Sequence, residues 1–212
     1  MKSPLYSFFI LLLFLFTFIS CKSGNEITSE NMSDFDEDFK IVGDVLSSVI
    51  AESLSSDMIT EILKDEEAYK SGRLIIVEGK KNGKTKILVK PSMNVDKLIA
   101  NVKFDIGFGF ENFENEKYSL TNDSSMKFII DFTMNMSNNT FTKSYMSLNG
   151  TIKYKGTKNG KCVIVLEADD FFRDKIDKES LLKKMNGYMT INGKKIDFKT
   201  LFDKFGDKDI DV

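Results

Sequence analysis

The sequence predicts an α+β domain in which a curved, mostly antiparallel β-sheet packs against a long N-terminal amphipathic helix. Apolar residues recur with a helical period over residues 41–63, and with a period of two over residues 98–110 and 126–136. Asn-Gly pairs, which favour tight hairpin turns, occur five times between residues 82 and 193. We therefore expect a meander or a half-barrel, followed by short C-terminal helices.

The N-terminal segment has the pattern of a secretory signal peptide. Lys2 is followed by an apolar run from Phe8 to Ile19 that only Thr17 interrupts. As a helix this run would span roughly 18 Å, whereas a hydrocarbon core is about 30 Å thick. An uncleaved short anchor and a buried helix are the alternatives. The basic start, the length of the run and the small residue Ser20 favour export.

The residues at the end of this run, Phe18, Ile19, Ser20 and Cys21, resemble the lipobox of bacterial lipoproteins, with Phe18 where Leu is usual. The resemblance covers the signal segment alone. It implies that residues 1–20 are removed and that Cys21 then carries a diacylglycerol and an acyl chain such as palmitate. Two or more chains anchor a protein stably, because each buried CH₂ contributes about 0.8 kcal/mol. Lys22 and Ser23 lack the Asp that retains some lipoproteins in the inner membrane, which favours the outer membrane or cell surface.

The rest of the chain divides into a tether and one domain. Residues 21–39 are polar and acidic, which predicts a flexible acidic tether. We expect residues 40–212 to form a single α+β domain. It opens with the amphipathic helix at Ile41 to Leu63, whose apolar stripe we expect to cover the sheet. A coiled-coil partner helix is the alternative interpretation of that stripe.

The sheet is predicted from alternation and turns. Even-numbered positions are apolar from Leu98 to Phe110 and from Met126 to Met136, so each segment is a long strand with one buried face. Asn-Gly turns predict hairpins that join residues 73–79 with 84–90, 143–148 with 151–155, and 188–191 with 194–198. A turn at 156–160 leads into a strand at 161–168. Asn186-Gly187 is expected to end a short helix at 178–185, and another short helix spans about 200–205.

Composition argues against several classes of function. The chain has no His and two Cys, which removes His-dependent catalysis and His-based or Cys₄ metal sites. Its formal net charge is −2, which is unlike a nucleic-acid-binding domain. Cys162 lies in an apolar run and is interpreted as a small buried side chain. We therefore expect no catalytic residue, no metal, no cofactor and no nucleic-acid partner, although a site assembled from distant Asp, Glu and Lys residues stays open.

Two functions follow as hypotheses. The first is a lipid-anchored, non-enzymatic binding or surface-interaction module, whose partners are the membrane, through its acyl chains, and an unknown protein. The alternative is a carrier of lipid or another apolar ligand, because five Phe residues fall on one predicted face and could line a concavity. They could equally pack against the 41–63 helix as a solid core. The candidate lining residues are Phe104, Phe108, Phe110, Phe128 and Phe132.

Overall fold

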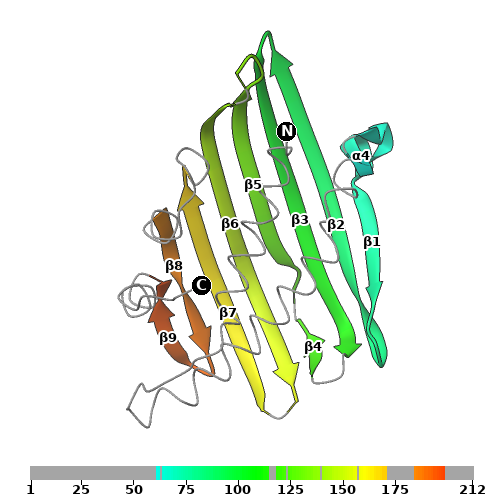
Figure 1. Cartoon of the computed structure of the whole chain (residues 1–212). Helices are drawn as coiled ribbons and strands as arrows, with labels where there is room; N and C mark the ends of the chain where they lie inside the picture. The colour runs from blue at the N-terminus through cyan, green and yellow to red at the C-terminus, as the bar shows by residue number, and fades with distance from the viewer. Residues whose placement is uncertain are drawn as a thin grey trace, which may run out of the picture.

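The computed structural model describes residues 61–62, 64–114, 118–122, 124–138, 140–156, 158–170 and 184–198. Its main feature is one nine-stranded antiparallel sheet (Figure 1). The elements are α4 (Glu66–Ser71), β1 (Arg73–Glu78), β2 (Asn82–Asp96), β3 (Ile99–Glu114), β4 (Ser119–Thr121), β5 (Met126–Asn135), β6 (Thr140–Lys155), β7 (Asn159–Asp169), β8 (Met185–Ile191) and β9 (Lys194–Asp197).

The strands follow one another across the sheet as an open meander. Strands that are neighbours in sequence pair with each other, from β1 at one edge to β9 at the other, except that β4 and β5 do not pair with each other. The position between β3 and β6 is shared, because β4 and β5 both pair with β3 on one side and with β6 on the other. The two strands thus form one interrupted strand.

Asn122 lies at this interruption. Its side-chain oxygen accepts a hydrogen bond from the backbone N–H of Phe110 at 2.9 Å, and its side-chain amide donates to the carbonyl of Phe108 at 3.0 Å. The Asn side chain therefore supplies to β3 the donor and acceptor that a strand backbone would otherwise supply. This keeps β3 hydrogen-bonded across the break.

The alternating sequence pattern defines one buried face of the sheet. In β3 the even-numbered residues from Ala100 to Phe110 are buried, as are Met126, Phe128 and Ile130 in β5. The predicted long strands at 98–110 and 126–136 are therefore confirmed, with β3 extending further, to Glu114. We call this side of the sheet the inner face and the opposite, more polar side the outer face.

Two of the predicted hairpins are confirmed. β8 and β9 are joined by Asn192 and Gly193, both with positive φ (50° and 83°), as a type I′ turn requires. β1 and β2 also pair as expected, but their turn lies earlier in the chain than predicted. The N–H of Gly79 donates to the carbonyl of Gly83, and Gly83 lies within β2 at a shift in register.

The hairpin predicted at Asn149-Gly150 is wrong. Both residues lie inside β6, which runs unbroken for 16 residues. The physical reason is the interrupted strand beside it: β6 must pair with β5 through Asn149 and with β4 from Lys153 onward. A turn at this point would leave one of the two without a partner.

The helix end predicted at Asn186-Gly187 is also wrong, because both residues lie in β8. Gly187 has φ 119°, and a Cβ atom there would lie 2.0 Å from the carbonyl oxygen of Val165. The glycine therefore permits a close approach to the neighbouring strand and does not end a helix. Of the predicted helices at 178–185 and 200–205, residues 178–183 and 200–205 lie outside the described residues, and Met185 begins β8.

The predicted α+β class is corrected by this architecture. The described chain is mostly antiparallel sheet, and its one helix with both ends described, α4, has six residues. No long N-terminal helix packs against the sheet in the part of the chain that the structure describes, and residues 41–60 of the predicted 41–63 helix lie outside it. The physical reason is that strand pairing extends through nearly all of the described residues between 73 and 197, whereas the helical period is confined to one segment. None of the described helices is long and apolar enough to cross a membrane.

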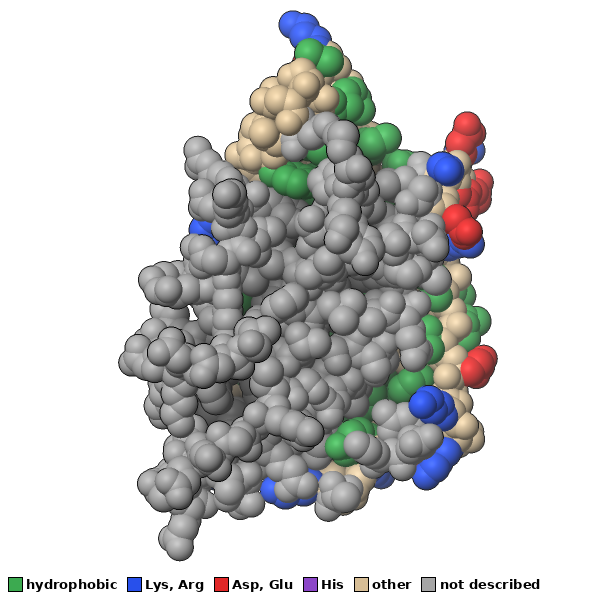
Figure 2. All heavy atoms as spheres, viewed as in Figure 1, with side chains coloured by type: hydrophobic (Ala, Val, Ile, Leu, Met, Phe, Trp, Pro, Cys, Tyr) green, Lys and Arg blue, Asp and Glu red, His purple; other side chains and the backbone are tan. Residues whose placement is uncertain are grey.

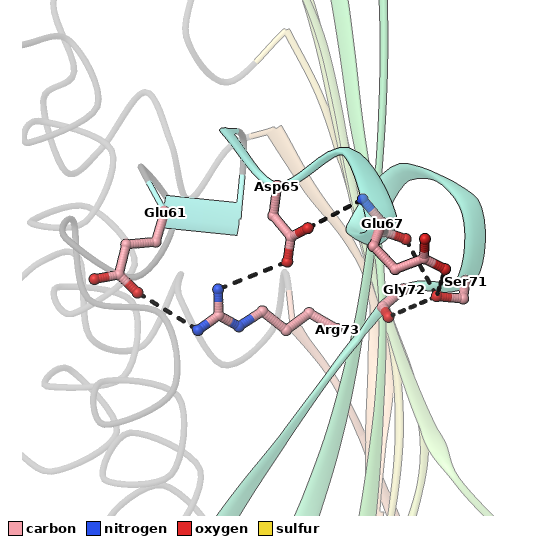
Figure 3. A network of polar contacts seen from close by, with 6 residues as sticks. All are labelled: Glu61, Asp65, Glu67, Ser71, Gly72 and Arg73. Atoms are coloured by element: carbon pink, nitrogen blue, oxygen red, sulfur yellow. Dashed lines mark hydrogen bonds and ion pairs between the residues drawn. The ribbon is translucent and has the colours of Figure 1, made fainter.

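The short helix α4 leads directly into β1. Asp65 caps it, its carboxylate accepting a hydrogen bond from the N–H of Glu67 at 3.0 Å, and Gly72 ends it with φ 83°. Arg73 then lies 3.5 Å from the carboxylate of Glu61 and 3.9 Å from that of Asp65 (Figure 3). Exposed ion pairs of this kind add little stability, but they place the start of β1 beside the helix.

Candidate functional site

The five predicted lining residues lie together on the inner face. Phe104, Phe108 and Phe110 alternate along β3, while Phe128 and Phe132 lie on β5. The register sets Phe128 opposite Ile106 and Phe132 opposite Val102 in β3. Both strands therefore direct their Phe residues to the same side of the sheet.

Burial divides these five residues into two groups. Phe104, Phe108, Phe110 and Phe128 are at most 4% exposed. Phe132 is only partly buried, and its ring meets that of Phe141 edge-on, with centroids 5.5 Å apart. The buried four could be core or lining, while Phe132 marks where the inner face begins to open toward solvent.

Thr85 places a hydroxyl within this apolar face. It belongs to the odd-numbered series of β2 with Ile87 and Val89, is 0% exposed, and lies opposite Phe110 in β3. Among the described residues its Oγ1 is the one buried side-chain polar atom with no hydrogen-bond partner. An unsatisfied buried hydroxyl costs about 1–3 kcal/mol, so its presence needs a reason. Sequence analysis missed it, although a Thr among Ile and Val at period two was a visible signal.

One end of the inner face is exposed. Met93, Val95, Leu98 and Met136 are each between 37% and 55% exposed, and we call these four residues the apolar tip. Met93 and Val95 lie opposite Val102 and Ala100, which are buried, so the tip continues the inner face without a break. Figure 2 shows hydrophobic side chains gathered at this projecting end of the molecule.

The apolar tip lies at the turn between β2 and β3, and a backbone hydrogen bond joins it to the end of β5. Lys97 occupies this turn with φ 55°, and the N–H of Met136 donates to the carbonyl of Leu98 at 2.7 Å. Two methionines give the surface an adaptable apolar character. Alternation predicted which side of the strands these residues would face, but it could not predict where burial of that side would end.

The outer face carries rows of opposite charge on neighbouring strands. Glu111 on β3 is paired with Lys86 and, at 3.8 Å, with Lys84, both on β2, and Asp105 lies 3.0 Å from Lys127 of β5. Hydrogen bonding from Lys86, with a further contribution from Lys84, lowers the pKa of Glu111. All five side chains are at least about one-third exposed, and the carboxylates are each matched to a cation. The arrangement is a solvated ionic surface rather than an acid–base pair.

The remaining chemistry-bearing residues are buried or dispersed. Cys162 is 0% exposed on the inner face between Ile152 and Ile191, which confirms its interpretation as a small buried side chain. No cluster of three or more metal-ligating side chains occurs within the described ranges. Phe18, Ile19, Ser20 and Cys21 lie outside them, so lipidation stays a prediction.

Comparison with known proteins identifies no relative. No family model, no curated protein and no solved structure matches the chain.

Proposed function

We propose that the chain is an exported, lipid-anchored bacterial lipoprotein whose domain is a non-enzymatic interaction module that binds a protein partner through the apolar tip. The observation that carries the second part is the exposure of Met93, Val95, Leu98 and Met136 as one continuous patch. Exposed apolar surface of this kind is typical of interaction sites. The first part rests on the sequence of the signal segment and Cys21, and with it we propose the outer membrane or cell surface as the location.

Lipid attachment is tested by substituting the cysteine that would carry the acyl chains. Cys21→Ala should abolish labelling with a palmitate analogue and release the protein from the membrane fraction. Cys162→Ala is the matched control, because it removes the other thiol of the chain and should keep both label and membrane association. Unchanged labelling of the Cys21→Ala protein would refute lipidation.

The tip is tested by photo-cross-linking in intact cells. A photoreactive amino acid at Val95, which is 46% exposed, should form one discrete protein adduct. The adduct should disappear when Met93 and Leu98 are both changed to Asn, and persist when the similarly exposed Leu74 and Ile76 are changed to Asn. An adduct indifferent to the tip substitutions, or none at all, would contradict the proposal.

A carrier of an apolar ligand is the second candidate, favoured by the five converging Phe residues and the unpaired hydroxyl of Thr85. A ligand head group that accepts a hydrogen bond would satisfy that hydroxyl. Full-length protein should then copurify with lipid in native mass spectrometry, and Thr85→Val should reduce that occupancy. If no lipid copurifies and Thr85→Val only stabilises the fold, the carrier function is excluded.

A further inference from the structure

The two edges of the described sheet differ in how they are protected. Strands at sheet edges present unpaired N–H and C=O groups that attract other strands, and proteins discourage this with short strands, Lys, Pro or bulges. β9 has four residues and begins with Lys194 and Lys195. Lys195 additionally covers the ring of Tyr188, with its Nζ 4.1 Å from the ring centroid. This edge has the usual protection.

The β1 edge has none of these features. Its six residues are Arg73, Leu74, Ile75, Ile76, Val77 and Glu78, with no Lys, Pro or Gly and no net charge. Within the described residues β1 pairs only with β2. Short segments that are rich in β-branched residues and low in net charge pair readily with other strands.

The outer side of β1 is apolar as well as unpaired. Leu74 is 55% and Ile76 is 49% exposed, and both face the same side as Leu88 of β2. Ile75 and Val77 point to the inner face and are partly buried against the core. In Figure 2 hydrophobic atoms are visible along the edge that β1 forms, and in Figure 1 α4 lies at the N-terminal end of the strand.

We propose that β1 pairs with β1 of a second copy of this chain, which would join two sheets edge to edge across a two-fold axis. A two-fold axis perpendicular to the sheet keeps inner faces together and outer faces together. Residues that pair must therefore share a face, which excludes every register that sets an even-numbered residue against an odd-numbered one.

The strand is self-complementary in the register centred on Ile75. There the two copies of Ile75 lie opposite each other on the inner side, and Leu74 lies opposite Ile76 of the second copy on the outer side. The centre of the junction then has aliphatic cross-strand pairs on both faces, which favour antiparallel pairing. At the two ends of its inner side, Arg73 lies opposite Val77 of the second copy. A shift that centres the pairing on Ile76 would instead set Leu74 against Glu78. The long apolar stem of Arg73 can cover Val77 while its charged head stays in water, which the shorter Glu78 does less well for Leu74, so the Ile75 register is preferred.

The occupant that this strand itself specifies is a second copy, because its own six residues supply both sides of the pairing. The contact is narrow compared with the roughly 1,200–2,000 Å² of stable interfaces. We therefore expect a reversible dimer, which a covalent cross-link would trap. The inference does not depend on lipid anchoring or on the apolar tip.

The register is tested with single cysteines in the full-length protein, purified in detergent. Opposite residues have Cα atoms about 4.5–5.5 Å apart, within the range of a disulfide. Ile75→Cys should therefore form a disulfide-linked dimer under mild oxidation. In Ile76→Cys the two thiols would be diagonal, about 7–8 Å apart, and should cross-link on the order of tenfold more slowly. Lys195→Cys, on the protected edge, controls for random collision.

Disruption of the proposed dimer is tested by introducing one lysine either on β1 or on the apolar tip. Ile76→Lys, combined with Ile75→Cys, should reduce the cross-linked fraction to that of the Lys195→Cys control. Met93→Lys combined with Ile75→Cys should leave the cross-linked fraction unchanged. Met93 has an exposed fraction similar to that of Ile76 (50% and 49%), but it lies on the apolar tip and not on β1. Cross-linking of Ile75→Cys no faster than the control, cross-linking unaffected by Ile76→Lys, or a disulfide to a different protein would overturn the proposal.

Discussion

Asn122 closes the gap that the interrupted strand leaves beside β3. Its amide group makes two hydrogen bonds to the backbone of Phe108 and Phe110. Asn122→Ala would leave both backbone groups unsatisfied in a partly buried place, so we expect the free energy of unfolding to fall by about 1–3 kcal/mol. Urea denaturation measures this.

The control for Asn122 is Asn101, whose side chain accepts a hydrogen bond from Thr133 at 2.8 Å in an exposed position. Water can replace that bond, so Asn101→Ala should change stability by less than about 0.5 kcal/mol. Equal effects of the two substitutions would show that Asn122 has no special role at the strand break.

Glu111 gives the outer face a measurable response to pH. Its pKa is lowered mainly by the hydrogen bond from Lys86, and to a smaller extent by Lys84. A carboxylate whose pKa is lower in the folded than in the unfolded chain adds stability above its unfolded pKa, and this is lost as the pH falls through the folded pKa. Lys86→Gln should raise the pKa of Glu111 in an NMR titration, and Lys84→Gln should raise it less. The reverse order would contradict the assignment.

At the scale of elements, β6 shows how neighbouring strands override a local turn signal. Gly150 sits in mid-strand, and a Cβ atom there would lie 2.6 Å from Cγ and 2.8 Å from Cα of Met126. Gly150→Ala should therefore destabilise the protein by about 1–3 kcal/mol through overpacking. Gly107→Ala is the matched control, since a Cβ atom added at Gly107 would have no neighbouring atom within 4 Å. That substitution should be neutral or stabilising by up to about 1 kcal/mol. Thermal unfolding of both variants distinguishes them.

Prediction from sequence succeeded where the signal depends on one strand alone. Alternation in β3 and β5 predicted the buried face, and Asn192-Gly193 predicted its hairpin, because each depends on local backbone geometry. It failed at Asn149-Gly150 and Asn186-Gly187, where the requirements of the adjacent strands decide the conformation. Strand length is set by the partner strands, and their lengths are not visible within a local window.

Part of the candidate site was predicted from the sequence, and part of it was not. The five Phe residues do converge, since alternation and register follow from the strands themselves. The apolar tip was not predicted, because exposure of Met93 and Val95 depends on how far the inner face is covered. Thr85 was missed because its burial opposite Phe110 follows from the pairing of β2 with β3.

At the scale of the whole molecule, the described sheet is asymmetric: one edge strand is short and basic, and the other is apolar and has no second partner strand among the described residues. In an edge strand, alternate N–H groups point away from the sheet and exchange readily with solvent. If two copies pair through β1, the outward amides of β1 gain partners while those of β9 do not. Hydrogen exchange of the full-length protein should therefore slow severalfold in β1 as protein concentration rises, with β9 unchanged.

The Ile76→Lys protein provides the internal reference for this measurement. It keeps the fold, since Ile76 is half exposed, but adds a charge beside the centre of the proposed junction, opposite Leu74 of the second copy. Exchange in its β1 should no longer depend on concentration and should match the dilute wild-type protein. Concentration-dependent protection that also occurs in β9, or that survives Ile76→Lys, would mean that copies associate by another surface. In that case the open β1 edge would need a different explanation.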